Sequence, residues 1–441
     1  MPEGDCDQPG LLQLLASKDR ASLGAESAAA SMFVRNFLSF VQGPSFDNRS
    51  GDAFQDSLGA LAEFDKHISS NCSEIYGKSM IQKTRETSHT VCKGKSSVVC
   101  HERVPFDIPR YFCELQNVQI GEDSTRVESC EVTAWAREAT WGWCEKPFLE
   151  ELQSQDLPLA CNLTTSRKAL LQMPWDTRNL YEWLGDWVTL WETLAILDWN
   201  PKDVDIFLNI EPGSMKSRPF DDAWQHAFSS EAVHVGTRKD LFGQGACFSH
   251  LATVPHGGLS TPTFNGGRGG LVSCASPTLM SSAVFLERIF PSVKPPGDLT
   301  LTLILRTGSR GFEDEDEAVQ AVTKALLPGW SLRTYRPETL KTLNEQIAVA
   351  QSTQVLVGAH GAGMTHALFL PPHARVVEIW CGDRGSENHH FRNLEVLSDE
   401  SAAHAPEQFH FGISALRCGV DENAVKAMKA AMTAYQKDQA M

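Results

Sequence analysis

The chain has 441 residues, of which 42% are hydrophobic and 21% are charged, and its formal net charge is −16 at pH 7. This length exceeds one ordinary hydrophobic core and predicts two domains, and the composition is typical of a soluble globular enzyme rather than a disordered or fibrous chain. The negative charge argues against a nucleic acid as partner, because phosphate binding needs clustered Lys and Arg.

Residues 1–65 are rich in Ala, Ser, Gly and Asp, and we expect most of them to form a loosely ordered leader. Glu3, Asp5 and Asp7 give its start the wrong charge for a signal peptide. Residues 32–41 are apolar with phenylalanines at helical spacing, which predicts a packed helix. No stretch approaches the roughly 20 consecutive apolar residues of a membrane-spanning helix. The sequence therefore shows neither a signal peptide nor a membrane span.

The twelve cysteines are concentrated in the first half of the chain, with seven of them between Cys72 and Cys161. They contain no C-x-x-C pair and no zinc-type spacing. They are therefore either disulfide partners in an oxidising compartment or buried unpaired thiols. N-glycosylation sequons occur at Asn48, Asn71 and Asn162, but chance alone supplies about that many, so they add little.

Residues 66–291 are expected to form the first domain. A helix is predicted over 179–197, because six apolar residues lie on one face at helical spacing, and a strand is predicted over 204–210. The glycine run 266–270 is expected to be a surface loop, and 292–297 to be a linker. The six apolar positions are Leu180, Trp183, Leu184, Trp187, Leu190 and Leu194.

Residues 298–400 are expected to form the second domain, because strands and helices alternate there with short loops. The predicted strands are 299–305, 330–335, 354–357 and 375–380, and the predicted helices are 315–326, 337–351 and 364–370. This pattern predicts a parallel sheet covered by helices, with ligands bound beyond the carboxyl ends of the strands. A tail over 401–441 follows, with an amphipathic helix over 421–435.

The second domain carries a glycine-rich turn between a predicted strand and a predicted helix. Gly358 ends the strand, and Gly361 and Gly363 lead into the helix, where glycine lets an anion approach the free N–H groups of the helix N-terminus. The spacing is neither that of dinucleotide sites nor that of a P-loop. A plain tight turn is therefore the alternative.

Charged residues lie near this turn. Arg306 and Arg310 follow the first strand of the domain, where they can clamp phosphate oxygens or form salt bridges with the acidic run 313–317. Glu378 lies inside an apolar strand and needs a partner, which is either a ribose diol or a buried salt bridge. His389 and His390 are expected to form a solvated pair.

Three stretches carry a resemblance to a known family. The sequence QVLVGAHGAGMTHALFLPPHARVVEIW, residues 354–380, resembles the signature of glycosyltransferase family 61. LTLILRTGSRGF, residues 301–312, resembles the strand of that family that ends in Arg, and NLYEWLGDW, residues 179–187, resembles its N-x-x-H-x-x-x-D stretch. The resemblance implies a GT-B-like α/β architecture, in which two Rossmann-like domains face each other across a cleft. It also implies inversion at the anomeric carbon without a bound metal or other cofactor.

The resemblance implies roles for particular residues. Asp186 corresponds to the acidic residue on the acceptor side and is the candidate general base. Glu182 stands at the position of the family histidine, so it either takes over an acid/base role or that contact is lost. A capping or salt-bridging role is the alternative for both carboxylates. The implied donor-binding residues are Arg306, Arg310, His360, Gly361, Ala362, Gly363, Thr365, His366 and Glu378.

The function expected from the resemblance is the transfer of GlcNAc or xylose from a UDP-sugar to an acceptor hydroxyl on a protein or a glycan. The resemblance also implies the lumen of the secretory pathway, either the endoplasmic reticulum or the Golgi. One alternative is a catalytically inactive protein of the same fold that binds a nucleotide sugar or a glycan. A second alternative is a nucleotide-dependent oxidoreductase. The absence of the G-x-G-x-x-G motif argues against this function.

Overall fold

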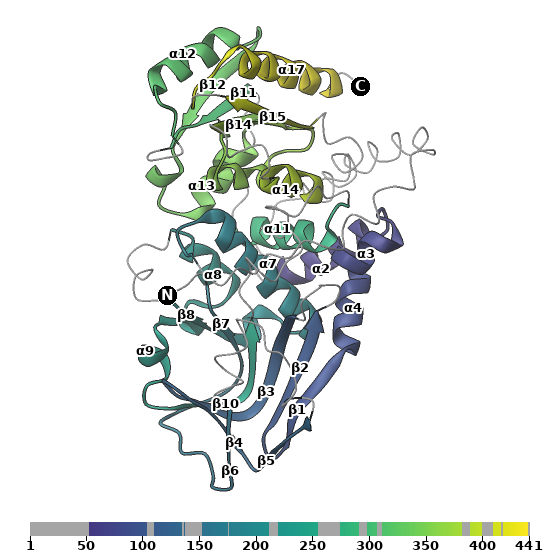
Figure 1. The fold of residues 1–441 in the computed structure, drawn as a ribbon, viewed down its shortest axis with the longest axis vertical. Helices are drawn as coiled ribbons and strands as arrows, with labels where there is room; N and C mark the ends of the chain where they lie inside the picture. Colours follow the sequence, from purple (N-terminus) through teal and green to yellow (C-terminus); the bar gives the residue numbers. More distant parts are fainter. Residues whose placement is uncertain are drawn as a thin grey trace.

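The computed structural model describes residues 53–103, 110–134, 136, 152–174, 176–210, 219–254, 274–290, 298–306, 311–381, 389–398, 409–415 and 418–439. The predictions for 32–41, 266–270, 292–297 and Arg310 lie outside these residues. The described part is a mixed α/β structure with two sheets and a layer of helices between them (Figure 1). The α/β class is confirmed, and the GT-B arrangement stays a prediction.

The larger sheet has ten strands and combines antiparallel with parallel pairing. Its order is β5-β1-β2-β3-β10-β7-β8-β9, with β4 paired to β3 and β6 paired to β4. The strands are β1 (Ser88–Gly94), β2 (Ser97–Arg103), β3 (Arg110–Ile120), β4 (Thr125–Glu128), β5 (Cys130–Val132), β6 (Leu152–Gln155), β7 (Leu163–Gln172), β8 (Val204–Asn209), β9 (Val233–Gly236) and β10 (Ala246–Val254).

Only part of this sheet has the parallel pairing of a Rossmann-like domain. Strands β10, β7, β8 and β9 are parallel, whereas β1, β2 and β3 pair antiparallel with one another and β3 pairs antiparallel with β10. No helix lies between β1, β2 and β3 in the described chain, and strands joined so directly pair antiparallel.

Most of the helices in the half of the chain that forms the larger sheet lie above that sheet in Figure 1. They are α2 (Ala53–Phe64), α3 (Ser70–Tyr76), α4 (Lys78–Glu86), α7 (Leu180–Leu197), α8 (Asp221–Ala227), α9 (Arg238–Phe242) and α11 (Pro277–Ile289), with the 3-10 helices η2 (Pro201–Asp203) and η4 (Ser230–Ala232). Helix α2 falls within the predicted leader, yet it packs on α11 and buries Phe54, Leu61 and Phe64. The leader prediction is therefore wrong for residues 53–64, because apolar residues at helical spacing give this Ala- and Gly-rich stretch a face to bury.

Helix α7 is surrounded by protein on all sides. It matches the helix predicted over 179–197, but sixteen of its eighteen residues are buried, so the prediction of one apolar face is too narrow. The Asn179 side chain accepts from the amide of Tyr181 at the start of the helix. At its end, Arg85 of α4 donates to the carbonyls of Ala195 and Ile196 at 2.5 and 2.7 Å.

The smaller sheet has five parallel strands in the order β12-β11-β13-β14-β15. The parallel sheet predicted for this half is thus confirmed. Strand β15 and helix α14 are additions that the sequence does not predict. The elements are β11 (Leu299–Ile304), α12 (Glu315–Ala325), β12 (Trp330–Tyr335), η5 (Pro337–Thr339), α13 (Leu343–Gln351), β13 (Val355–Ala359), η6 (Ala362–Phe369), β14 (Arg375–Cys381), α14 (His390–Ser398), β15 (His410–Ala415) and α17 (Glu422–Gln439).

The helix predicted over 337–351 is two elements, η5 and α13. Thr342 separates them, because its hydroxyl accepts from the amide of Glu345 while the Glu345 carboxylate accepts from the amide of Thr342. This capping box starts a new helix at this point. Asp222 of α8 adds a second cap from the other half of the chain, accepting from the amides of Leu343 and Asn344 at 3.1 Å each.

One hydrophobic core runs through the helical layer and joins the two halves. It contains apolar residues of α2, α7, α8 and α11 together with residues of η6, α13, α14 and one face of the smaller sheet. A second cluster fills the other side of the larger sheet, and a third lies between the smaller sheet and helices α12 and α17. The halves therefore share a packed interface.

Ten of the twelve cysteines form five disulfides. The disulfide alternative is thus confirmed for these cysteines, and Cys6 and Cys144 lie outside the described residues. Among the described residues, no helix is both long and apolar enough to cross a bilayer. The disulfides are Cys72–Cys274, Cys92–Cys130, Cys100–Cys113, Cys161–Cys247 and Cys381–Cys418.

Candidate functional site

The predicted glycine turn joins β13 to η6 at the carboxyl edge of the smaller sheet. Gly361 has φ 150° and ψ 176°, a backbone conformation that is essentially restricted to glycine. Gly358 and Gly363 allow close packing, because a Cβ at Gly358 would lie 2.8 Å from the Met364 sulfur and one at Gly363 would lie 3.2 Å from Ile304. The amides of Ala362 and Gly363, the first two of η6, have no acceptor within the helix, whereas the amide of Met364 donates to the carbonyl of Gly361 at 2.8 Å.

Glu378 is completely buried in β14, between histidines of the two flanking strands. Its Oε1 accepts from Nδ1 of His360, which directly follows β13, at 2.5 Å. Its Oε2 lies 3.0 Å from Nε2 of His410, the first residue of β15. Burial raises the pKa of Glu378, but hydrogen bonds and charge from the two histidines outweigh it and hold that pKa below its usual value. The structure therefore supplies the buried salt bridge that was one of the two alternatives for Glu378.

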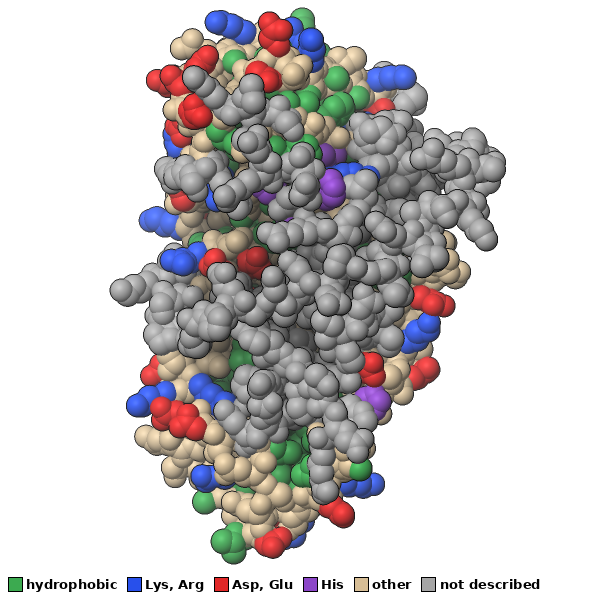
Figure 2. All heavy atoms as spheres, in the orientation of Figure 1, with side chains coloured by type: hydrophobic (Ala, Val, Ile, Leu, Met, Phe, Trp, Pro, Cys, Tyr) green, Lys and Arg blue, Asp and Glu red, His purple; other side chains and the backbone are tan. Residues whose placement is uncertain are grey.

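This contact determines how His360 presents its ring. An ionised carboxylate can only accept hydrogen bonds, so Nδ1 of His360 carries a proton and Nε2 is turned away from Glu378. The ring packs edge-on against Phe391 of α14, and 15% of the side chain remains exposed. In Figure 2 several histidine side chains lie close together in the upper half of the view, which holds the smaller sheet.

His366 is buried and holds the glycine turn in place. Its Nδ1 donates to the carbonyl of Gly363 at 2.6 Å, so Nε2 accepts from the hydroxyl of Tyr335 at 3.1 Å. Oε1 of the Gln346 side chain also lies 3.1 Å from Nε2. Burial lowers the pKa of His366 to about 4, although the Gly363 carbonyl opposes this shift. Predicted as a donor contact, His366 is thus placed as a support beneath the turn.

Two further predicted donor residues lie next to the turn. Arg306 follows β11 and is half-buried, and its Cδ lies 3.5 Å from the position of a Cβ on Gly363. Thr365 is completely buried in η6, and its hydroxyl has no hydrogen-bond partner among the described residues. The structure thus brings Arg306, His360 and the first turn of η6 together.

Helix α7 brings the predicted acceptor-side carboxylates toward the same region, because it packs directly on η6. Asp186 is completely buried, whereas Glu182, one turn earlier, is half-buried. Glu182 is therefore the more accessible of the two. The buried amide of Gln172 donates to the backbone carbonyl of Asp186 at 3.1 Å and ties this part of α7 to the end of β7.

His389 and His390 do not form a solvated pair, and that prediction is wrong. Nδ1 of His390 is hydrogen-bonded to the hydroxyl of Tyr181, the second residue of α7, and the two rings pack edge to face. His389 is half-buried, and burial together with the Arg392 charge lowers its pKa, although Glu378 opposes the shift. The start of α14 thus packs against the start of α7.

Sequence reasoning missed the partners of the predicted residues. His410 holds Glu378, and Tyr335 and Gln346 hold His366, across sequence separations of 20 to 32 residues. The one sequence signal for His410 was its place in the apolar run 409–415, where a lone imidazole needs a partner.

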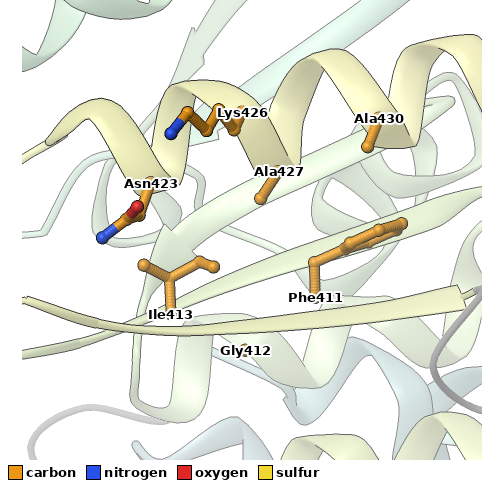
Figure 3. A pocket seen from close by; sticks show the side chains of 7 residues that line it. All are labelled: Phe411, Gly412, Ile413, Asn423, Lys426, Ala427 and Ala430. Carbon is orange, nitrogen blue, oxygen red and sulfur yellow. The ribbon is translucent and has the colours of Figure 1, made fainter.

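Two other features bear on the site. Among the described residues, no group of three or more His, Cys, Asp or Glu side chains could hold a metal ion, and metal independence stays a prediction. A pocket of about 460 Å³ lies between β15 and α17, on the face of the sheet opposite η6 (Figure 3). Its lining, which includes Phe411, Ile413 and Lys426, contains none of the predicted site residues.

Comparison with known proteins supports the resemblance. Residues 246–377 match the sequence model of the family described as Glycosyltransferase 61, a span that runs from β10 into β14. The chain is 27% identical over 270 residues to the EGF domain-specific O-linked N-acetylglucosamine transferase of Drosophila melanogaster, covering 56% of this chain and 49% of that protein.

Two further relatives match shorter stretches. The Bos taurus protein of the same name is 27% identical over 214 residues, covering 46% of this chain and 39% of its own length. A xylan glycosyltransferase of Arabidopsis thaliana is 29% identical over 137 residues, covering 31% of this chain and 23% of its own length. The chain thus spans between about a quarter and about half of the length of these relatives. The signature, the matched span and these relatives together support the similarity of this chain to glycosyltransferase family 61.

Proposed function

We propose that this chain is a glycosyltransferase that uses a UDP-sugar, with the donor bound at the carboxyl edge of the smaller sheet. The observation that carries the proposal is the turn at Gly361, whose glycine-only conformation leads into the N-terminus of η6 beside His360 and Arg306. Helix N-termini bind phosphate through free amides and the helix dipole. The diphosphate lies against these amides, and Arg306 and Nε2 of His360 stabilise the charge of the leaving UDP.

In this proposal Glu378 supports the donor site without touching the sugar nucleotide. As an ionised carboxylate held by His410, it orients His360 so that Nε2 points away from the sheet. His366 and Thr365 support η6 in the same way. No metal is required, because arginine, histidine and backbone amides carry the charge of the diphosphate.

The donor sugar is GlcNAc or xylose, and the acceptor is a hydroxyl of a protein or a glycan. Relatives whose names specify EGF domains and xylan support both acceptor classes. Disulfides persist in oxidising compartments, so the five disulfides support the lumen of the endoplasmic reticulum or the Golgi as the place of action.

The test is UDP binding by the wild type and by Gly361→Val. If the site binds the donor, UDP should raise the melting temperature of the wild type. The UDP-sugar that gives the largest increase identifies the donor. In Gly361→Val a β-branched residue cannot take the Gly361 conformation, so the shift should disappear while the protein stays folded by circular dichroism. Gly329→Val is the matched control, because Gly329 also has a positive φ but lies in the turn before β12, away from the site. Equal UDP shifts in the wild type and Gly361→Val would remove the turn from the donor site.

The general base is proposed to lie in the pair Glu182 and Asp186. Burial favours Glu182 as the group that meets the acceptor, and Asp186 is the alternative from the resemblance. If Glu182 is the base, Glu182→Gln should lower the transfer rate by about 10²-fold or more without loss of UDP binding, and Asp186→Asn should do less. The reverse order would assign the base to Asp186. Normal transfer in both variants would place the base elsewhere.

The same assay separates the enzyme from a binding protein that has lost turnover. The substitution of the family histidine by Glu182 is the feature that favours the second function. Transfer or hydrolysis of labelled UDP-sugars, measured with and without EDTA, decides between the two. UDP binding without any turnover would support the binding protein, and loss of activity in EDTA with rescue by manganese would contradict metal independence.

A further inference from the structure

We propose that Asn162 is a site of N-linked glycosylation. The sequon Asn162-Leu163-Thr164 lies at the start of β7, next to the disulfide between Cys161 and Cys247. The disulfide ties the start of β7 to β10, so the sequon sits on a fixed part of the larger sheet. The proposal does not depend on transferase activity, but it does require passage through the secretory lumen.

The first line of evidence is accessibility. All three residues of the sequon are exposed. Strand β7 pairs with β10 from Leu163 onward, whereas its pairing with β8 begins only at Lys168. The first part of β7 therefore has a side to which β8 is not paired. A glycan on Asn162 points into this region without displacing a β8 partner.

The second line is the hydrogen bonding of the side chain. Nδ2 of Asn162 donates to the carbonyl of Gln244 at 2.6 Å. A side-chain amide has two N–H groups, and N-glycosylation replaces only one of them. The remaining N–H can keep this hydrogen bond, so the folded protein accommodates the modification without losing a contact. The bond also fixes the direction in which the glycan leaves the surface.

The third line is the apolar surface around the sequon. In the described part of the chain, the exposed large hydrophobic side chains are Leu157, with 74% of its area accessible, and Leu163, with 49%. Leu163 is the middle residue of the sequon, and Leu157 lies five residues before Asn162 in the loop between β6 and β7. Exposed apolar groups mark interaction or aggregation surfaces, and a bulky, solubilising glycan at this point would cover them.

The other described sequon provides an internal comparison. Asn71 is exposed, but it lies in helix α3. The hydroxyl of Ser73 is buried and bonded to Asp65 at 2.7 Å. Neither an open extended strand nor an exposed apolar neighbour accompanies this sequon. Asn162 is therefore the site that the surface accommodates best.

The chemistry is a transfer carried out by the oligosaccharyltransferase of the cell. Its donor is an oligosaccharide linked through a diphosphate to a polyprenyl lipid. The Nδ2 atom of Asn162 forms a bond with the anomeric carbon of the first sugar, and the bond from that carbon to the diphosphate oxygen breaks. Nδ2 loses one proton, and the lipid diphosphate leaves with the electron pair of the broken bond. No oxidant or reductant is needed.

The test uses the full chain produced through a eukaryotic secretory pathway. Peptide-N-glycosidase F should increase the mobility of the wild type on a denaturing gel, and mass spectrometry should find the glycan on the peptide with Asn162. Asn162→Gln and Thr164→Ala should abolish that glycopeptide. Thr164→Ser should keep it, because serine also completes the sequon, and Asn71→Gln should leave it unchanged. This pattern would support the proposal.

Other outcomes would overturn it. An unmodified Asn162 peptide in a protein whose disulfides have formed would exclude glycosylation although the chain had passed through the lumen. Free thiols throughout would remove the lumenal route itself. Neither result would bear on UDP binding, which is measured separately. Enzymatic removal of the glycan should also increase aggregation, and Leu157→Ser combined with Leu163→Ser, which preserves the sequon, should suppress that increase. An equal aggregation rate before and after deglycosylation would contradict the covering role.

Discussion

The two halves of the molecule are stabilised in different ways. The half built on the larger sheet, residues 53–290, contains four of the five disulfides, and the Cys72–Cys274 bridge joins residues 202 positions apart. The half built on the smaller sheet, residues 298–439, has one bridge with a separation of 37. In that half each strand is followed by a helix that packs on the sheet. Contacts between elements that are adjacent in the chain therefore stabilise this half with few disulfides.

This difference bears on the place of the proposed donor site. A parallel sheet with helices on both faces places the ends of its strands at one edge, where turns can approach a ligand. Its regular packing also holds a buried polar set inside the sheet, in which Glu378 contacts His360 at that edge and His410 at the start of β15. The larger sheet pairs strands from distant parts of the chain and depends on cross-links to hold them. We infer that the first half mainly provides a rigid support and the second half the donor chemistry.

The largest expected effect is the loss of the Cys72–Cys274 bridge. Removing a native disulfide typically costs about 2 to 5 kcal/mol, and the loss grows with the length of the closed loop. We expect Cys72→Ser with Cys274→Ser to lower the free energy of unfolding by an amount in this range. The measurement is denaturant unfolding followed by tryptophan fluorescence, to which Trp183, Trp187 and Trp191 of α7 contribute together with the other tryptophans of the chain.

Cys381→Ser with Cys418→Ser is the matched control in the other half. The entropic cost of closing a loop of 202 residues exceeds that of a loop of 37 residues by about 1.5 kcal/mol. The control should therefore lose less stability. An equal or larger loss in the control would mean that the smaller sheet depends on its bridge as much as the larger one does. The contrast between the halves would then fail.

A second prediction concerns pH and the support beneath the glycine turn. The folded protein keeps His366 neutral, with a pKa of about 4 against 6.5 for the ordinary group. Between these values the unfolded chain binds a proton that the folded chain does not, so stability is lost as the pH falls from about 6.5 to about 4. The full effect is about 3 kcal/mol, because each pKa unit corresponds to about 1.4 kcal/mol.

His366→Gln isolates this contribution. The variant should be less stable than the wild type at pH 7, because the bond to the Gly363 carbonyl is altered, but its stability should fall less steeply between pH 6.5 and 4. His226→Gln, at an exposed position on α8, should keep the slope of the wild type. The slopes come from unfolding curves at a series of pH values. Identical slopes in the wild type and His366→Gln would show that His366 takes up protons freely in the folded state.

The sequence predicted the smaller sheet far better than the larger one, and the reason is physical. Strands buried on both faces form nearly continuous apolar runs, and β11, β13 and β14 are such strands and lie within two residues of the predicted limits. The edge strand β12 also matches its predicted limits, although Ser331, Arg333 and Thr334 interrupt its apolar residues. Strands β1, β2 and β3 follow one another in the chain, but the larger sheet is completed by pairing of β3 with the distant β10, which local patterns do not encode. Disulfide connectivity cannot be deduced from cysteine spacing either.

The same contrast between local and distant contacts applies to the candidate site. The glycine turn, Arg306 and His360 were found because they are contiguous with regular elements. The partners that decide what Glu378 and His366 do, namely His410, Tyr335 and Gln346, come from other strands and helices, so their roles emerge only from the tertiary structure. His366 therefore changed from a predicted ligand contact to a support.

The smallest expected effect tests whether the two halves unfold together. Asp222 of α8 accepts hydrogen bonds from Leu343 and Asn344 at the start of α13, although that helix already has its own cap at Thr342. Because a carboxylate at a helix N-terminus also interacts with the helix dipole, Asp222→Ala should cost about 1 kcal/mol.

Thr342→Ala should cost a similar amount, since it removes the cap that lies within the same half. If the halves form one cooperative unit through their shared core, both variants should shift the whole unfolding transition. This includes the fluorescence of the α7 tryptophans in the other half, measured with Trp330 and Trp380 of the smaller sheet replaced by Phe. If the halves unfold separately, Thr342→Ala should leave the α7 signal in place and change only the far-ultraviolet circular dichroism of the smaller sheet. Asp222→Ala would then act mainly on the contact between α8 and α13, and the double variant would show the two losses adding. A single transition that moves equally in both probes would show that the bridged half and the regular half depend on one core for their stability.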